Sequence, residues 1–171
     1  DVYVEDTPTI ELEQLAANIM GKESALLVSS GTMGNLISNL VHCPRGTESI
    51  MGHKSHTFLY ESGGISTYGG IHSHQLKNNE DGTIQIKDIK DAIRAQDVHF
   101  PKTSLICLEN THNKCHGYPL DIDYIDQVCS LAHDNNIKVH MDGARIFNAA
   151  VAMEIGVDSI VKNVDSITFC L

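Results

Sequence analysis

The stretch VHMDGARIF at residues 139–147 predicts the end of a buried strand followed by the start of a helix. Val139 to Met141 form the apolar strand end, and the helix is expected from Ala144 onward. Asp142 and Arg145 then lie at the carboxyl edge of the strand, where open α/β sheets bind their ligands. Asp142 and Arg145 either form an ion pair with each other or bind different groups of a cofactor and its substrate. In the second case the carboxylate binds a protonated ring nitrogen and the guanidinium binds a substrate carboxylate.

Helix and strand patterns alternate on both sides of this stretch. Helical spacing of apolar residues predicts helices at 9–20, 33–41, 86–93 and 119–135, and a short one at 57–61. Apolar or alternating runs predict strands at 25–28, 48–51, 71–76, 104–108 and 166–171. Such alternation indicates the α/β class, with a mostly parallel sheet flanked by helices.

Length and composition exclude several classes of partner. The 171 residues suit one α/β domain, and the formal net charge of -10 argues against nucleic acid and anionic membranes as partners. No apolar run is long enough to cross a bilayer. Cys107, Cys129 and Cys170 fall in apolar segments, which predicts reduced, buried thiols. We therefore expect a cytoplasmic location, with mitochondria as the alternative.

A serine- and glycine-rich turn separates the 25–28 run from the following helix. Its sequence, SSGTMGN at 29–35, allows backbone N–H groups to close around an anion, supported by the helix dipole. It matches neither the GxGxxG nor the Walker pattern, so a nucleotide is not indicated. A simple helix cap is the equally weighted alternative.

Two further clusters carry histidines. His56 precedes the short helix, where its imidazole can lie on a flat cofactor ring or move a proton, whereas His53 fits a surface or capping role better. The polar run ENTHN at 109–113, with His112, directly follows a buried strand and so falls at the same sheet edge as the 29–35 turn and Asp142. No zinc spacing such as CxxC or HExxH is present, and we expect no metal.

These motifs resemble those of the low-specificity L-threonine aldolases. The resemblance rests on SGTMGN at 30–35, His56 with Tyr60-Glu61, ENTHN at 109–113 and HMDGARIFN at 140–148, and it extends to the opening DVYVED and the closing DSITFCL. It implies the pyridoxal-phosphate-dependent transferase-like fold (fold type I), with residues 1–171 forming part of the large cofactor-binding domain. It also implies a homo-oligomer.

The resemblance implies a role for each matching residue. Gly31 and Thr32 hold the phosphate of pyridoxal 5'-phosphate (PLP), His56 stacks on its ring, and Asp142 binds the ring nitrogen. Arg145 faces the substrate carboxylate, and His112, with His56, lies near the substrate hydroxyl. The implied reaction is retro-aldol cleavage of a β-hydroxy amino acid, L-threonine or L-allo-threonine, to glycine and acetaldehyde.

One departure qualifies this expectation. The family's Schiff-base lysine follows the strand that residues 166–171 resemble, and no lysine of this chain matches its position; Lys162 precedes that strand. We therefore expect a fragment without the small C-terminal domain, inactive by itself. Two alternatives stay open: another PLP lyase of the same fold, β-eliminating or acting on other β-hydroxy amino acids, and a non-catalytic truncated homologue.

Overall fold

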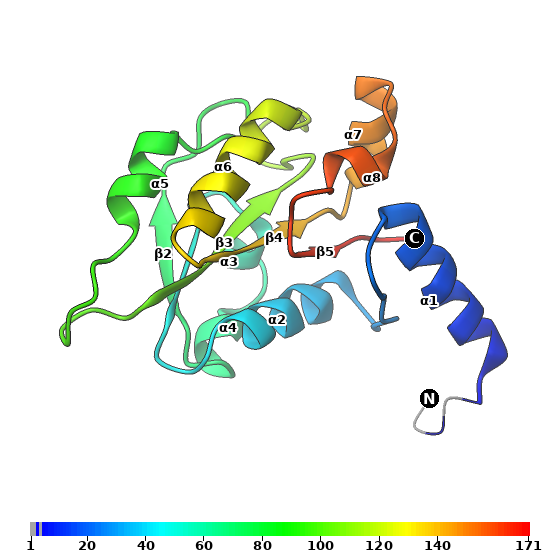
Figure 1. The fold of residues 1–171 in the computed structure, drawn as a ribbon, viewed down its shortest axis with the longest axis horizontal. Coiled ribbons are helices and arrows are strands. Elements are labelled where there is room, and N and C mark those ends of the chain that lie inside the picture. Colours follow the sequence, from blue (N-terminus) through cyan, green and yellow to red (C-terminus); the bar gives the residue numbers. More distant parts are fainter. Residues whose placement is uncertain (1–2, 4) are drawn as a thin grey trace.

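Five parallel strands form a single sheet in the order β2-β1-β3-β4-β5 (Figure 1). The computed structural model describes residue 3 and residues 5–171, so residues 1, 2 and 4 of the DVYVED stretch lie outside the described part. The strands are β1 (Glu48–Gly52), β2 (His72–Leu76), β3 (Thr103–Glu109), β4 (Lys138–Asp142) and β5 (Ser166–Thr168). The predicted α/β class with a parallel sheet is confirmed.

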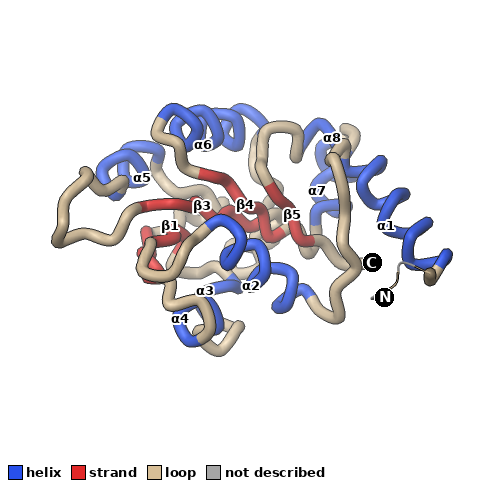
Figure 2. Tube along the Cα trace, turned by 60° about the horizontal axis from the view of Figure 1, so that its bottom comes forward, coloured by secondary structure: helices blue, strands red, loops and turns tan. Residues whose placement is uncertain are grey.

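Helices cover both faces of the sheet (Figure 2). In chain order they are α1 (Thr7–Met20), α2 (Gly31–His42), α3 (His56–Leu59), α4 (Gly64–Thr67), α5 (Ile86–Ala92), α6 (Ile122–Asp134), α7 (Ile146–Met153) and α8 (Val157–Ile160). Figure 2 shows α2, α3 and α4 on one face and α5, α6 and α8 on the other. The short helix predicted at 57–61 is confirmed as α3, and α4 is a further short helix that was not predicted. None of the described helices is long and apolar enough to span a bilayer.

The two faces of the sheet differ in chemistry. Side chains alternate along a strand, so Val139 and Met141 of β4 enter the large apolar core formed with α6. His140 and Asp142, between and after them, therefore face α2, and both are buried. The α2 face holds only a small apolar cluster, which includes Met51 and Leu105. Buried polar groups thus occupy the α2 face near the carboxyl edge.

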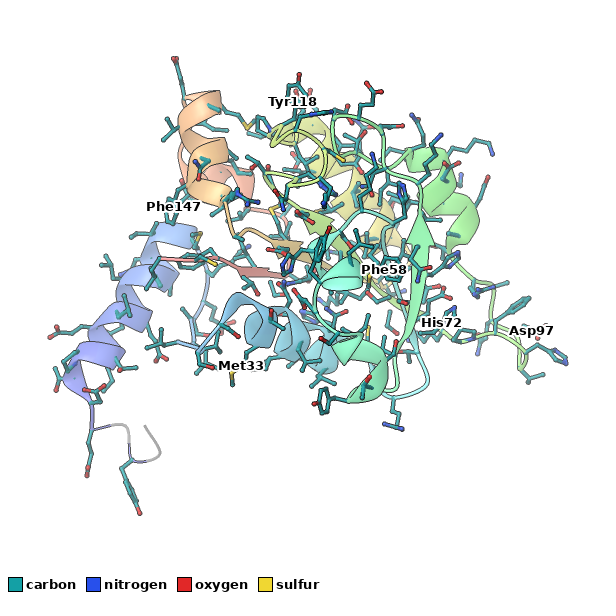
Figure 3. All side chains as sticks on the ribbon, turned by 180° about the vertical axis from the view of Figure 1, so that it is seen from behind. Met33, Phe58, His72, Asp97, Tyr118 and Phe147 are labelled. Carbon is teal, nitrogen blue, oxygen red and sulfur yellow. The ribbon has the colours of Figure 1, made fainter. Side chains whose placement is uncertain are left out.

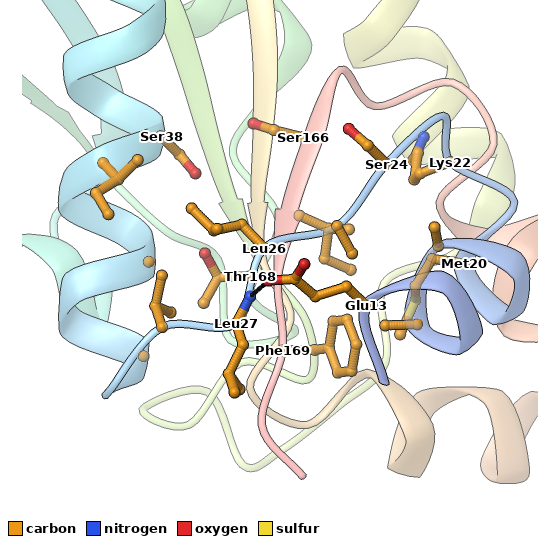
Figure 4. A pocket seen from close by; sticks show the side chains of 18 of the residues that line it. Glu13, Met20, Lys22, Ser24, Leu26, Leu27, Ser38, Ser166, Thr168 and Phe169 are labelled. Atoms are coloured by element: carbon orange, nitrogen blue, oxygen red, sulfur yellow. Dashed lines mark hydrogen bonds between the residues drawn. The ribbon is translucent and has the colours of Figure 1, made fainter. Parts of the chain in front are cut away.

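The segment 25–28 forms no strand in the structure, so that prediction was wrong. The main-chain N–H of Leu27 donates to Glu13 Oε1 at 2.8 Å, and no described strand pairs with this segment. A groove of about 790 Å³ separates it from β5 and is lined also by α1 and α2 (Figure 4). The strand expected at 166–171 ends at Thr168, and Cys170 is exposed rather than buried. An apolar segment becomes a strand only where a neighbouring strand offers backbone groups for hydrogen bonding, and composition does not report such a neighbour.

Candidate functional site

A cavity of about 440 Å³ opens at the carboxyl edge of the sheet. Its wall comes from the beginnings of α2 and α3, the ends of β3 and β4, and the residues that follow those strands. The lining residues are Gly31, Thr32, Asn35, His56, Glu109, Thr111, Asn113, Asp142, Ala144, Arg145 and Cys170. The position matches the expected ligand edge of a parallel sheet.

The beginning of α2 faces this cavity. Ser30 is the N-cap, and its hydroxyl accepts the N–H of Met33 at 3.1 Å, so the capping interpretation is confirmed. The N–H groups of Gly31 and Thr32 precede the intrahelical hydrogen bonds, and none of the described residues accepts from them. They remain available to an anion, and the helix dipole adds positive potential there. Their role as phosphate ligands stays a prediction.

Asp142 ends β4 with its carboxylate at the cavity wall. The side-chain amide of Asn35 donates to Asp142 Oδ2 at 2.9 Å, and the N–H of Ala144 donates to Oδ1 at 3.2 Å. Arg145 follows at the start of α7, is exposed, and forms no ion pair within the described residues. The acid and base of the 139–147 stretch therefore do not neutralise each other.

His56 begins α3 and is held from two sides. Its Nδ1 lies 2.9 Å from Glu61 Oε1, and its main-chain N–H donates to Glu109 Oε2 at 2.8 Å. The side chain is 40% exposed, which leaves part of the ring open to the cavity. Burial raises the pKa of both Glu61 and Glu109, against the hydrogen bonds that each carboxylate accepts. These two carboxylates were part of recognised motifs, but their contacts to His56 are visible only in the structure.

His112 lies behind the cavity rather than in its lining. The residue is 1% exposed, and neither ring nitrogen has a hydrogen-bond partner among the described residues. Its Nδ1 is 3.8 Å from Glu109 Oε1, and the backbone of Gly82 packs against its Cβ. Burial, with the nearby charge of Lys54, lowers the pKa of His112 to about 4. Its expected place near a substrate hydroxyl stays a prediction.

The other histidine of the 53–56 region has a structural contact. His53 Nδ1 accepts the N–H of Asn78 at 2.9 Å, in agreement with the capping role favoured from the sequence. The structure thus gathers five of the six predicted site residues, namely Gly31, Thr32, His56, Asp142 and Arg145, around one cavity.

Asn35 is a site residue to which sequence reasoning gave no role. It is 2% exposed on the inner side of α2 and contacts both Asp142 and Glu61. The signal was the spacing of Asn35, Asn39 and His42, which puts polar residues on the one side of the helix that faces the sheet. Side-chain atoms of His56, Glu61 and Asp142 lie within 4.8 Å of one another, but the Asn35 amide already bridges the two carboxylates.

Comparison with known proteins identifies close relatives. The low-specificity L-threonine aldolase 1 of Arabidopsis thaliana is 48% identical over 174 residues, which cover 100% of this chain and 49% of the relative. The chain spans about half the length of the curated relatives it matches.

Two solved structures show the same fold. A threonine aldolase of Leishmania major superposes with a TM-score of 0.74 at 20% identity, over 89% of this chain and 45% of that one. A serine palmitoyltransferase of S. paucimobilis with bound PLP superposes with a TM-score of 0.61 at 20% identity, over 79% of this chain and 30% of that one. The predicted fold type I architecture is confirmed.

The model of the beta-eliminating lyase family matches residues 1–171, which is the whole chain. The match therefore includes all the cavity-lining elements, from the start of α2 to the residues after β5. This chain belongs to the beta-eliminating lyase family.

Proposed function

We propose that this chain is the PLP-binding part of a lyase that cleaves L-threonine or L-allo-threonine to glycine and acetaldehyde. The observation that carries the proposal is the meeting of the α2 N-terminus, His56, Asp142 and Arg145 around one cavity. The end-to-end identity with threonine aldolases supports the choice of reaction.

The donors and acceptors of the cavity fit PLP. The N–H groups of Gly31 and Thr32, at a helix N-terminus, suit a phosphate. Asp142 is 6% exposed and has lost most of its solvation, so its carboxylate suits a protonated ring nitrogen at the cavity wall. The half-exposed His56 ring offers a flat surface to an aromatic group. PLP, when bound, supplies the electron sink for the bond that is cleaved.

The chain's own residues supply the remaining functions. Asp142 keeps a proton on the ring nitrogen, and Arg145, free of any described carboxylate partner, binds the substrate carboxylate. The hydroxyl of the substrate needs a proton acceptor, and His56 is the histidine that lines the cavity. His112 assists only after a movement that brings its ring to the cavity, because it is buried and lies outside the cavity lining.

A second candidate is binding of PLP without turnover. No lysine belongs to the described residues that line the cavity, so nothing there can form the covalent link to the cofactor. A related lyase reaction on the same fold, such as β-elimination, is distinguished from the aldolase reaction by its product.

The test is acetaldehyde release from L-threonine and L-allo-threonine with added PLP. This chain is measured beside a longer version that includes the sequence region which its relatives carry beyond the match. PLP binding is followed by absorbance in both. We expect PLP binding in both and acetaldehyde only from the longer version. Binding without acetaldehyde in either would remove the aldolase proposal, and pyruvate or another keto acid from β-hydroxy substrates would indicate β-elimination.

A further inference from the structure

A continuous chain of hydrogen bonds runs behind the cavity between α2 and the sheet. The Asn35 amide group donates to Asp142 Oδ2 at 2.9 Å and to Glu61 Oε1 at 2.8 Å. Its carbonyl oxygen, Oδ1, lies 3.1 Å from His140 Nε2. His140 Nδ1 lies 2.9 Å from Ser166 Oγ, and the same Oγ lies 2.9 Å from His42 Nε2.

The directions of these hydrogen bonds follow from the chemistry of the groups. An amide oxygen only accepts, so His140 Nε2 must carry the proton that points to Asn35. Burial lowers the pKa of His140 to about 3, so the ring is neutral near pH 7 and its Nδ1 is an acceptor. The Ser166 hydroxyl therefore donates to His140 and accepts from His42. One orientation satisfies every donor and acceptor in the series.

This arrangement fixes which end of the Asn35 amide meets the carboxylates. A flipped amide would put Oδ1 at 2.8 to 2.9 Å from an oxygen of Glu61 and an oxygen of Asp142, with no hydrogen between them. His140 prevents the flip because its Nε2–H needs a hydrogen-bond acceptor. The oxygen of the Asn35 amide can accept, whereas the NH₂ group that a flip would bring there cannot. His140 is 0% exposed and Asn35 is 2% exposed, so neither side chain is in contact with bulk water.

We propose that His140 and Asn35 are positioning residues which hold the Asp142 and Glu61 carboxylates side by side in the orientation that the cofactor requires. Asp142 then presents its carboxylate to the ring nitrogen, and Glu61 holds the His56 ring through Nδ1 at 2.9 Å. A single amide thus sets two of the cofactor contacts. This inference rests on the proposed PLP function.

The face of the sheet opposite Asn35 and His140 is apolar. Val139 and Met141 flank His140 in the same strand and pack into an apolar core. A buried imidazole that served only packing would be replaceable by an apolar side chain of the same volume, often at no cost. The proposal predicts that such a replacement changes the carboxylates of the cavity.

The experiment compares His140→Met with His140→Gln. Methionine fills the space but has no N–H for Asn35, whereas glutamine can donate to Asn35 and accept from Ser166. The first readout needs no cofactor: carbon-13 NMR follows the titration of Glu61 in the apo chain. The second is PLP affinity by absorbance titration, with the spectrum of the bound cofactor, from pH 6 to 8.5. Circular dichroism and thermal unfolding verify the fold.

In His140→Met we expect the pKa of Glu61 to rise by about one unit further, as when one charge-assisted hydrogen bond is lost. PLP binding should weaken by about tenfold, most at the low end of the pH range. His140→Gln should restore both values toward those of the parent. A folded His140→Met variant with the parent's Glu61 titration, affinity and spectrum would overturn the proposal.

Two further outcomes are distinguishable. If His140→Met does not fold, Ser166→Ala takes its place, because it removes only the hydroxyl that fixes the His140 tautomer. It should raise the Glu61 pKa in the same direction, and an unchanged titration would overturn the inference. If the parent binds no PLP, the proposed function fails, while the Glu61 titration still decides whether His140 and Asn35 position the carboxylates.

Discussion

The main-chain N–H of His56 donates to Glu109 Oε2 at 2.8 Å, which joins the start of α3 to the end of β3. The second oxygen of the same carboxylate accepts the N–H of Asn113 at 2.9 Å. Glu109 is 7% exposed, so these two N–H groups take the place of water as hydrogen-bond donors to its carboxylate. One side chain thereby holds two loops of the cavity wall.

Glu109→Gln should weaken this connection. An amide has one accepting oxygen, so its NH₂ end would face one of the two N–H donors. We expect the free energy of unfolding to fall by about 1–3 kcal/mol, the cost of a buried unsatisfied donor. Urea unfolding at pH 7 measures it, with Glu11→Gln on the exposed side of α1 as the control. Equal stability of the two variants would contradict the role given to Glu109.

Asp142→Asn should weaken PLP binding without unfolding the chain. The amide keeps the size of the side chain but removes the charge that holds a protonated ring nitrogen. We expect the dissociation constant for PLP to rise about tenfold or more, as for a lost charge-assisted hydrogen bond. Asp91→Asn is the control, because Asp91 is 60% exposed in a surface pair with Lys87. Similar PLP affinity in both variants would remove Asp142 from the proposed site.

His112 should make the protein sensitive to acid. The pKa of His112 lies near 4 in the folded chain and near its ordinary 6.5 when unfolded, so the unfolded state binds more protons between these values. Stability should therefore fall as the pH is lowered from about 6.5 to 4.

His112→Leu should reduce that slope. It also removes two buried nitrogens that have no partner in the described part of the chain, so stability at pH 7 should be kept or raised by about 1 kcal/mol. Thermal unfolding across pH 4–7.5 is the measurement. Val98→Ser, at a residue that is 96% exposed and carries no ionisable group, is the control and should keep the slope of the parent. An unchanged slope in His112→Leu would show that this histidine is not held neutral by burial.

The sequence was sufficient to predict that the site lies at the carboxyl edge of the sheet, but not the buried contacts between α2 and the sheet. Parallel strands place their carboxyl ends together, so Glu109 of β3 and Asp142 of β4 converge on one cavity whatever the details of packing. The turn at 29–35 reaches the same cavity, although no strand precedes it. The Asn35–His140 pair joins residues 105 positions apart, and no local pattern reports such a contact.

The strand prediction at 25–28 failed, and the burial of His112 could not be foreseen, because both depend on distant parts of the chain. An apolar run such as 25–28 becomes a strand only beside a partner with free hydrogen-bonding groups, and Leu27 instead donates to Glu13. His112 follows β3 in a polar run that suggests an open loop, yet the backbone at Gly82 packs over it and closes it off. In Figure 3, by contrast, the loop with Asp97 projects from the body of the molecule.

The groove between the 25–28 segment and β5 should promote association of this chain. Leu26 and Leu27 are 69% and 48% exposed beside it, and the described part of β5 pairs only with β4. We expect the double variant Leu26→Ser, Leu27→Ser to shift sedimentation velocity profiles toward the monomer. Val98→Ser, at a residue 96% exposed away from the groove, should leave the profile unchanged. The same shift in both variants would indicate general surface hydrophobicity instead.

Glu61 should have a pH effect opposite in sign to that of His112. Burial raises the pKa of Glu61 above its ordinary 4.5, so the folded chain binds more protons than the unfolded chain just above that pH. Stability from this group therefore falls as the pH rises through the raised pKa. Glu61→Gln keeps an oxygen for Asn35 and His56 and cannot ionise, so it should gain stability relative to the parent from pH 4.5 toward 7. Thermal unfolding over this range tests it, with the exposed Glu80→Gln as control. A difference in stability between Glu61→Gln and the parent that stays the same at every pH would mean that burial beside Asp142 does not raise the pKa of Glu61.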